Sequence, residues 1–519
     1  MLRDCFSKEA KLFLPIIAGI LISVVSLSSE LFMFVFFALI PLFYRLRQVR
    51  SFKEYVIMLS FYFFTSNFLQ FAFILRVSQF IPNSQKYAKP LLVIAVIVLA
   101  LYVSLINIIP MLIFTKVRTN RIYDVFIFSA LYILSEWFCE NVPLLSFPWI
   151  RLGTILSDFY IFLQSASIFG GLFISFLILV INGLVANAFC SENSRRLQYF
   201  CLLSAMIVFS ANSVYGLAKT HFTKIQGQRV SCMLLQVNLD AEEKWDVKAL
   251  QSLEAHYRLA SSSITAQNRP DIIVMPETAI NSKINENISV QNALARFAQN
   301  LNATIITGGF YRENDKTYNA LYVVNPDGTI ENPYLKNKLV PFGEYIPFEN
   351  LVKKIVPSVT EILRTKKGLS AFDKSDTINT EYGKITSLIC LESIYSAPAR
   401  EQCQNGGELI AIITNDAWFG DDFNLNTHFR HSVMRAVECG KYVVNCANSG
   451  ISAIITPYGK LSVKAPERAE SAVMANVIFT SKNTPYSFLG DIIILPSAAI
   501  IVWGIIKTAS KMLAKKLRK

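Results

Sequence analysis

Apolar residues gather in long uninterrupted runs at both ends of the chain, whereas the middle alternates apolar and polar positions. A helix needs about 20 apolar residues to cross the hydrocarbon core of a bilayer. Seven runs precede the middle region and one follows it, at about residues 12–28, 30–44, 55–75, 90–114, 122–138, 160–189, 197–217 and 488–506. The pattern therefore predicts a multi-span α-helical membrane bundle of about eight transmembrane helices, in which 30–44 is short for a span and 160–189 is long.

The middle region has the pattern of a separate α/β domain, in which short apolar runs bounded by turn residues alternate with amphipathic segments. Strands are expected at 229–238, 271–275, 304–310, 320–325, 384–390, 409–414, 443–447 and 452–455, and helices at 248–267, 290–301 and 427–439. Strands covered by helices on both faces form a layered sandwich. We therefore expect a transmembrane bundle at 1–217, a catalytic α/β domain at 218–487, and a transmembrane helix with a basic tail at 488–519.

Composition and charge agree with a membrane protein and suggest its orientation. Hydrophobic residues make up 53% of the chain and charged residues 17%, and the mean hydropathy is +0.39. Lys and Arg concentrate in alternate loops and in the tail, which places those segments in the cytoplasm and the α/β domain on the outer side. The net charge of +13 is then mostly anchoring charge, and no basic and aromatic patch indicates a nucleic-acid partner.

The nine cysteines show no pattern of a metal site, because no CxxC pair occurs. Cysteine in membrane segments usually only packs. A disulfide in the α/β domain is conceivable in an oxidising compartment, but a catalytic thiol has to stay free. We expect no metal and no cofactor, and the sequence does not decide whether a disulfide forms.

Three polar residues follow apolar strands in the α/β domain and suggest acyl-transfer chemistry. Glu277 ends Ile-Ile-Val-Met-Pro-Glu, Lys336 follows Tyr-Leu, and Cys390 ends Ile-Thr-Ser-Leu-Ile-Cys. A base, a cation and a thiol are sufficient for nucleophilic catalysis. Taken singly, each has a plainer interpretation: Cys390 as core packing, Glu277 as a turn acid, and Lys336 as a solvated lysine with Lys338 as its competitor.

In this order the three residues resemble the carbon–nitrogen hydrolase (nitrilase) superfamily, whose fold is an αββα sandwich. Two segments, Leu-Val-Pro-Phe-Gly-Glu-Tyr-Ile-Pro at 339–347 and Asn-Asp-Ala-Trp-Phe-Gly at 415–420, are similar to the membrane-embedded apolipoprotein N-acyltransferase family. Phe-Pro-Trp at 147–149 and the membrane runs also match that family. The resemblance thus extends over the full chain.

The resemblance implies a role for each matching position. Cys390 corresponds to the nucleophile, Glu277 to the general base and Lys336 to the cation that stabilises the oxyanion. Supporting residues are Glu344, Glu392 and Asn319, and substrate-binding residues are Trp245, Trp418 and Tyr345. The chain departs from the family pattern at Met275, Leu391, Lys441, Tyr442 and Asn445, which affects loop geometry and substrate fit rather than the reaction.

The family further implies the reaction and its partners. A fatty acyl chain passes from a phospholipid, by a ping-pong mechanism through a Cys390 thioester, to the N-terminal amine of diacylglyceryl-cysteine on an apolipoprotein. This is the last step of bacterial lipoprotein maturation, and the enzyme is expected in the inner membrane as a monomer with a periplasmic catalytic domain.

Parts of the sequence pattern also fit other functions. A membrane-tethered amidase or nitrilase would use water as the acceptor, and a lipid-binding scaffold would not need Cys390. A transporter is disfavoured because the spans contain few charges and no visible inverted repeat. His428 invites a Cys–His pair, but no acidic partner stands at an obvious spacing from it.

Overall fold

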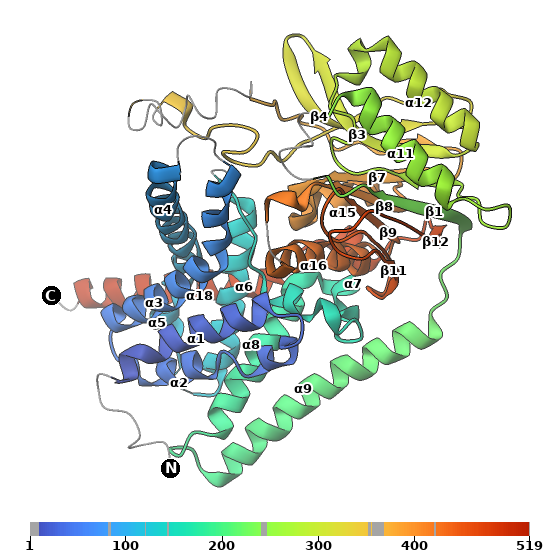
Figure 1. The fold of residues 1–519 in the computed structure, drawn as a ribbon. Helices are drawn as coiled ribbons and strands as arrows, with labels where there is room; N and C mark the ends of the chain where they lie inside the picture. The colour runs from blue at the N-terminus through green and yellow to red at the C-terminus, as the bar shows by residue number, and fades with distance from the viewer. Residues whose placement is uncertain are drawn as a thin grey trace. The chain divides into compact units, whose positions relative to one another are not determined.

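The computed structural model describes residues 10–80, 85–119, 121–142, 145–239, 247–350, 354, 368–419 and 422–517. The chain divides into two compact units (Figure 1). One is helical and contains residues 1–78, 84–223 and 489–519, and the other contains 79–83 and 224–488.

The helical unit holds most of the predicted spans as helices. Its main helices are α1 (Ala10–Leu27), α2 (Ile40–Gln48), α3 (Phe52–Phe71), α4 (Gln85–Met111), α6 (Tyr123–Asn141), α8 (Gly171–Ala188), α9 (Arg195–Phe222) and α18 (Ile494–Leu517). Within the described ranges, five helical segments are long and apolar enough to cross a membrane: Phe52–Arg76, Lys89–Val117, Gly171–Ala188, Arg195–Phe222 and Pro485–Lys507. Phe13–Leu27 is a shorter apolar helix. The number of such segments in the described part of the chain is thus below the predicted total of about eight transmembrane helices.

The prediction of one continuous span at 30–44 was wrong. A 3-10 helix, η1 (Phe32–Phe36), and the nine-residue α2 replace it. Pro41 lies in the first turn of α2, and a proline has no backbone N–H with which to continue a preceding helix. At the break, the Asn182 side chain of α8 accepts the Leu39 N–H at 2.9 Å and donates to the Val35 carbonyl at 2.8 Å. A buried side chain thereby satisfies the backbone groups that the interrupted helix leaves unpaired.

The long run at 160–189 is also not one helix. Two short helical turns, η4 (Phe162–Ser165) and α7 (Ala166–Phe169), precede α8. Gly170, with φ +78°, lies between α7 and α8 and interrupts the helix there. That conformation favours glycine because an L side chain is strained there. Only the 18 residues of α8 remain as a spanning segment.

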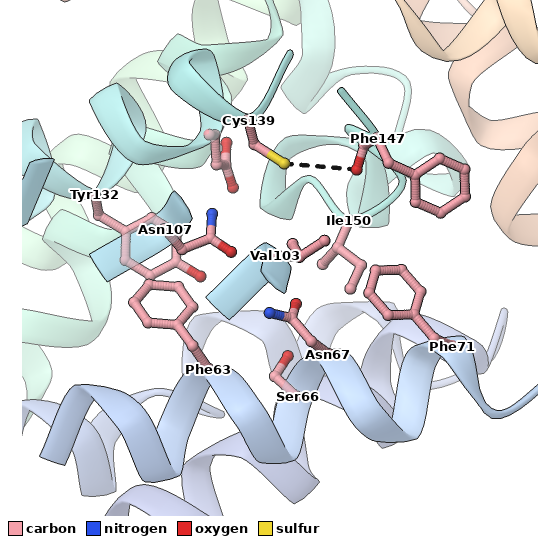
Figure 2. Close-up of a pocket in the computed structure, with 11 residues that line it drawn as sticks. Phe63, Ser66, Asn67, Phe71, Val103, Asn107, Tyr132, Cys139, Phe147 and Ile150 are labelled. Atoms are coloured by element: carbon pink, nitrogen blue, oxygen red, sulfur yellow. Dashed lines mark hydrogen bonds between the residues drawn. The ribbon is translucent and has the colours of Figure 1, made fainter. Parts of the chain in front are cut away.

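A small cavity in the helical unit lies among α3, α4, α6 and the segment that follows α6 (Figure 2). Asn67 and Asn107 lie among the aromatic rings that line it. The buried Glu136 also lines it and accepts the Leu152 N–H at 3.0 Å through Oε1. The cavity is large enough for about one water molecule.

The α/β unit consists of two six-stranded sheets. The first has the order β12-β1-β2-β3-β4-β5 and the second β11-β10-β9-β8-β7-β6. The strands of the first sheet are β1 (Gln228–Gln236), β2 (Ile272–Val274), β3 (Thr304–Glu313), β4 (Lys316–Val324), β5 (Tyr334–Leu335) and β12 (Ser471–Phe479). Those of the second are β6 (Ile378–Thr380), β7 (Gly383–Ile389), β8 (Leu409–Thr414), β9 (Val443–Ala447), β10 (Ala453–Ile455) and β11 (Leu461–Lys464).

The two sheets pack face to face with a helical layer outside each, which makes the predicted αββα sandwich. Side chains of both sheets form one buried cluster that includes Leu234, Val274, Ile389 and Ile413. On its other face the first sheet packs against α11 (Ala249–Ser263) and α12 (Ile288–Leu301) (Figure 1). The second sheet contacts α15 (Ser396–Gln404) and α16 (Asp422–Cys439). Burial on both faces explains the continuous apolar runs of the central strands.

The pattern of the sequence did not reveal every element. β12 pairs antiparallel with β1 along its whole length, from Gln228 opposite Phe479 to Gln236 opposite Ser471. Its sequence, Ser-Ala-Val-Met-Ala-Asn-Val-Ile-Phe, is largely apolar although most of its residues are only half-buried, and this strand was not predicted. β5, β6, β11 and α15 were missed as well; the first three contain only two to four residues each.

Candidate active site

Glu277 lies just beyond the carboxyl end of β2, where Met275 still donates its N–H to the Ile306 carbonyl at 2.8 Å. The turn then packs tightly against Gly308 of β3. A Cβ at Gly308 would lie 2.4 Å from the Thr278 nitrogen, so only glycine permits this approach. Thr278 itself has φ +44°. Glu277 is 7% exposed, and its Oε1 accepts hydrogen bonds from Lys336 and Asn319.

Lys336 follows β5 and is completely buried. Its Nζ donates to Glu277 Oε1 at 3.2 Å and to Glu344 Oε1 at 2.9 Å. Asn319 of β4 joins the same two carboxylates, since its Nδ2 lies 2.7 Å from Glu277 Oε1 and 3.0 Å from Glu344 Oε1. The Asn319 carbonyl also accepts the Lys336 N–H at 2.9 Å.

These carboxylates decide the charge of the lysine. Burial alone would lower the pKa of Lys336, but Glu277 and Glu344 reverse the effect and raise the pKa above its ordinary value. Lys336 is therefore an ammonium ion at every physiological pH. A buried charge is tolerated only when partners compensate it, and here two carboxylates do so.

Glu344 belongs to the loop that follows Lys336 and is fixed by that loop's own backbone. Its Oε2 accepts the Val340 N–H at 2.8 Å, while its Oε1 faces the ammonium. Phe342 in this loop has φ +62° and is half exposed. Tyr345, predicted to contact substrate, is half-buried in the same loop.

Cys390 lies at the sharp turn where β7 ends and a short 3-10 helix, η6 (Cys390–Ile394), begins. Its backbone has φ +52°, a conformation that costs energy for a residue with a Cβ and is often found at functional sites. Burial and the Glu277 carboxylate raise the pKa of the Cys390 thiol well above its usual value, and Lys336 opposes them only in part. A raised pKa favours the neutral thiol, so any reaction of this sulfur as a nucleophile would require a base that removes the proton.

Glu392 is fully buried beneath this turn and accepts four hydrogen bonds. Its Oε1 accepts from Tyr334 Oη at 2.8 Å and from the backbone N–H groups of Asn337 and Lys338 at 2.6 and 3.1 Å. Its Oε2 accepts the Ile389 N–H at 2.8 Å. Glu392 therefore joins the lysine strand to the cysteine turn. Lys338, the competitor of Lys336, is exposed and offers the carboxylate only its backbone.

His428 has an acidic partner, Asp416, which no obvious spacing in the sequence indicated. His428 of α16 places Nδ1 at 3.0 Å from Asp416 Oδ1, and its Nε2 lies 3.2 Å from the Cys390 carbonyl oxygen. Asp416 is in η7 (Asp416–Trp418), directly after β8. The signal was available in Asn-Asp-Ala-Trp-Phe-Gly, but the sequence does not show that α16 returns across the end of β8.

By distance, Cys390, Asp416 and His428 could also hold a metal ion, because one ligand atom from each lies within 4.8 Å of the others. Both ring nitrogens of His428 are already engaged in the hydrogen bonds described above. A metal ligand must offer a nitrogen lone pair, so this hydrogen-bonded arrangement would have to break before a metal could bind.

The remaining predicted residues are distributed as follows. Trp245 lies outside the described residues, and Trp418 is described only through its backbone in η7. Met275 and Leu391, at two departures from the family pattern, are buried. At a third, Lys441 is buried and its Nζ donates to the carbonyls of Thr480 and Lys482, so it supports the end of β12. The described cysteines are free thiols: Cys139, Cys190, Cys201, Cys232, Cys390, Cys403, Cys439 and Cys446.

Comparison with known proteins agrees with this arrangement of two units. Residues 232–480 match the carbon-nitrogen hydrolase family, and residues 18–184 match the N-terminal domain of apolipoprotein N-acyltransferase. The apolipoprotein N-acyltransferase of Allorhizobium ampelinum is 30% identical over 366 residues, which cover 69% of this chain and 67% of the relative. That of Haemophilus influenzae is 29% identical over 412 residues, covering 76% and 75%. A solved Saccharomyces cerevisiae member of branch 10 of the nitrilase superfamily covers 49% of this chain and 92% of its own, with 22% identity and a TM-score of 0.37.

Proposed function

This chain belongs to the apolipoprotein N-acyltransferase family, and we propose that it acylates lipoproteins through a covalent intermediate on Cys390. The donor is a phospholipid, and the acceptor is the N-terminal amine of diacylglyceryl-cysteine on an apolipoprotein. The observation that carries the mechanism is the contact of the Lys336 ammonium with the Glu277 carboxylate at 3.2 Å. The charges of both groups act on the pKa of the Cys390 thiol, as does that of Asp416.

In the first half-reaction, Glu277 takes the thiol proton while the Cys390 sulfur attacks the ester carbonyl of the phospholipid. The carbonyl oxygen becomes an oxyanion, which the Lys336 ammonium and backbone N–H groups after Cys390 stabilise. Well-studied oxyanion donors contribute about 3 kcal/mol each. When the carbon–oxygen bond breaks, Glu277 returns the proton to the departing alkoxide. A lysophospholipid leaves and a thioester remains on Cys390.

In the second half-reaction, the lipoprotein amine attacks the thioester carbonyl. Glu277 accepts a proton from the attacking nitrogen, and Lys336 again faces the oxyanion. Collapse forms the amide and breaks the carbon–sulfur bond, and the sulfur recovers its proton from Glu277. The free enzyme is thereby restored without a cofactor.

We place the enzyme in the bacterial inner membrane with the α/β domain on the periplasmic side. Support comes from the apolar helices of the helical unit and from the basic residues of the alternate loops and tail. Both proposed substrates carry lipid chains, and a bundle of membrane helices is a suitable environment for them.

The covalent step can be tested by mass spectrometry of the purified protein. After incubation with phospholipid alone, the wild type should gain the mass of one acyl chain on the peptide that contains Cys390. Glu277→Gln and Cys390→Ala should gain none, because one lacks the base and the other the nucleophile. An acyl chain on any other residue, or an unchanged yield in Glu277→Gln, would contradict the mechanism.

The acceptor separates this function from hydrolysis. Addition of a diacylated lipopeptide should transfer the acyl chain to the peptide amine and increase its mass. Release of free fatty acid without any acylated peptide would instead identify a membrane-tethered hydrolase that uses water.

A further inference from the structure

His428 occupies a buried position directly behind the nucleophile. It is 4% exposed, and its two ring nitrogens point at Asp416 Oδ1 and at the carbonyl oxygen of Cys390. Ser393 Oγ lies 3.1 Å from the same Nε2. The mechanism proposed above gives none of these contacts a role.

The partners of the ring define its protonation state. A carboxylate and a carbonyl oxygen only accept hydrogen bonds. Nδ1 therefore carries a proton toward Asp416, and the contact of Nε2 with the Cys390 carbonyl is a hydrogen bond only if Nε2 also carries one. Only the doubly protonated ring meets both conditions, and the Ser393 hydroxyl, which both donates and accepts, adapts to either form. A neutral ring would set a nitrogen lone pair against one of the two acceptor oxygens.

The carboxylate of Asp416 makes a positive charge on His428 favourable for the chemistry of Cys390. Asp416 is 4% exposed, and its carboxylate lies within 4.8 Å of the Cys390 sulfur. A carboxylate at that distance repels the negative charge that develops on the sulfur during attack. Thr414 Oγ1 donates to the same Oδ1 at 2.7 Å, but a hydroxyl cannot neutralise the carboxylate. The His428 imidazolium, hydrogen-bonded to Asp416, neutralises the carboxylate and thereby removes its repulsion of the negatively charged sulfur.

We propose that His428 is a positioning residue, held as an imidazolium by Asp416, which neutralises that carboxylate beside the nucleophile and fixes the carbonyl of the cysteine turn. The site then has two cations, Lys336 near Glu277 and His428 near Asp416. This inference rests on the proposed role of Cys390 as nucleophile and adds a second charged pair to it.

The groups that face the ring agree with a positive charge. They are Asp416 of η7, Cys390 of η6 and Glu277 after β2. Burial alone would lower the pKa of His428, but Asp416, the Cys390 carbonyl and Glu277 outweigh it and raise the pKa. The effect is the one expected for a histidine that gains a carboxylate partner in the fold.

The test measures the reactivity of the thiol itself and needs no lipid. The purified full chain is treated with iodoacetamide across a range of pH, and the rate of carbamidomethylation is read at the peptide that contains Cys390. His428→Gln should slow the reaction at neutral pH about tenfold or more, because a rise of one unit in thiol pKa reduces the thiolate about tenfold. His256→Gln, at a buried histidine of α11, is the matched control and should react like the wild type.

A double variant distinguishes charge from structure. Adding Asp416→Asn to His428→Gln removes the uncompensated carboxylate and should restore most of the lost reactivity. If His428 only supported the fold, the double variant would react as slowly as the single one or more slowly. That outcome, or coincident pH profiles for wild type and His428→Gln, would overturn the inference. Failure to form an acyl-enzyme would instead count against the proposed function, so the two are tested separately.

Discussion

Glu392 accepts the backbone N–H of Asn337 at 2.6 Å, although Asn337 follows β5 of the first sheet and Glu392 follows β7 of the second. Asn337 follows the lysine that contacts the proposed base, and Glu392 is in the turn that begins with the proposed nucleophile. One buried carboxylate thus holds the spacing between the ammonium and the sulfur. A shift of about 1 Å between such groups can cost about a hundredfold in rate.

We expect Glu392→Gln to destabilise the α/β unit and to reduce activity together. One accepting oxygen becomes an NH2 group, which faces backbone N–H donors and leaves at least one of them unpaired. An unsatisfied buried group costs about 1–3 kcal/mol, and more when a charge is involved. Thermal unfolding in detergent should show a clear loss of stability. Glu401→Gln, at an exposed position of α15, should leave both stability and activity unchanged.

Lys336→Met should abolish acyl transfer, whereas Lys338→Met should not. Loss of the buried ammonium leaves Glu277 and Glu344 without their cation, and breaking a buried ion pair costs about 3–5 kcal/mol. Removal of an oxyanion-stabilising group lowers kcat by about 10²–10³-fold. Lys338 is exposed, and its ammonium lies over the ring of Tyr395, 5.6 Å from the ring centroid. Initial rates with a diacylated lipopeptide would decide, and equal losses in the two variants would exclude Lys336 as the cation.

Asn319→Asp should be more harmful than Asn319→Ala, even though it is closer in shape. The aspartate would place a third carboxyl group within hydrogen-bonding distance of Glu277 and Glu344. Like charges so close cannot all ionise, so one carboxyl should take up a proton with a raised pKa. The rate of Asn319→Asp should therefore recover as the pH falls, and Asn319→Ala should show no such recovery. Parallel pH–rate profiles of the two variants would contradict this account.

The stability contributed by His428 should decrease as the pH rises. Its pKa in the folded protein is raised above the ordinary histidine value of about 6.5. The contribution is therefore complete below about pH 6.5 and is lost as the pH rises through the folded-state pKa. The difference in Tm between wild type and His428→Gln, measured from pH 6 upward, should be largest at about pH 6. A difference that is constant over this range would show that the folded histidine does not carry the extra proton.

The membrane helices, the strand-end residues and the layered sandwich could be predicted from the sequence, because each leaves a pattern in residues that are close together in the chain. The apolar runs at the two ends predict membrane helices, since a bilayer requires about 20 apolar residues in succession. The segments that end at Glu277 and Cys390 predict chemistry at strand ends, since a buried strand followed by a polar residue is visible in a few adjacent positions. The alternation of strand and helix patterns predicted a layered α/β sandwich for the same reason, whereas the αββα order was implied by the resemblance to the nitrilase superfamily.

Contacts between distant segments were decided by the tertiary structure. The break in the predicted span at 30–44 depends on Asn182, more than 140 residues away. The partnership of Asp416 and His428 depends on a helix that returns across the end of β8, and the bridge of Asn319 between two carboxylates depends on β4 lying beside β3 and β5. Sequence patterns record the burial and the local conformation that each residue prefers. They do not record which buried polar group will satisfy which other, because that pairing is fixed only when the two sheets and their helices pack together.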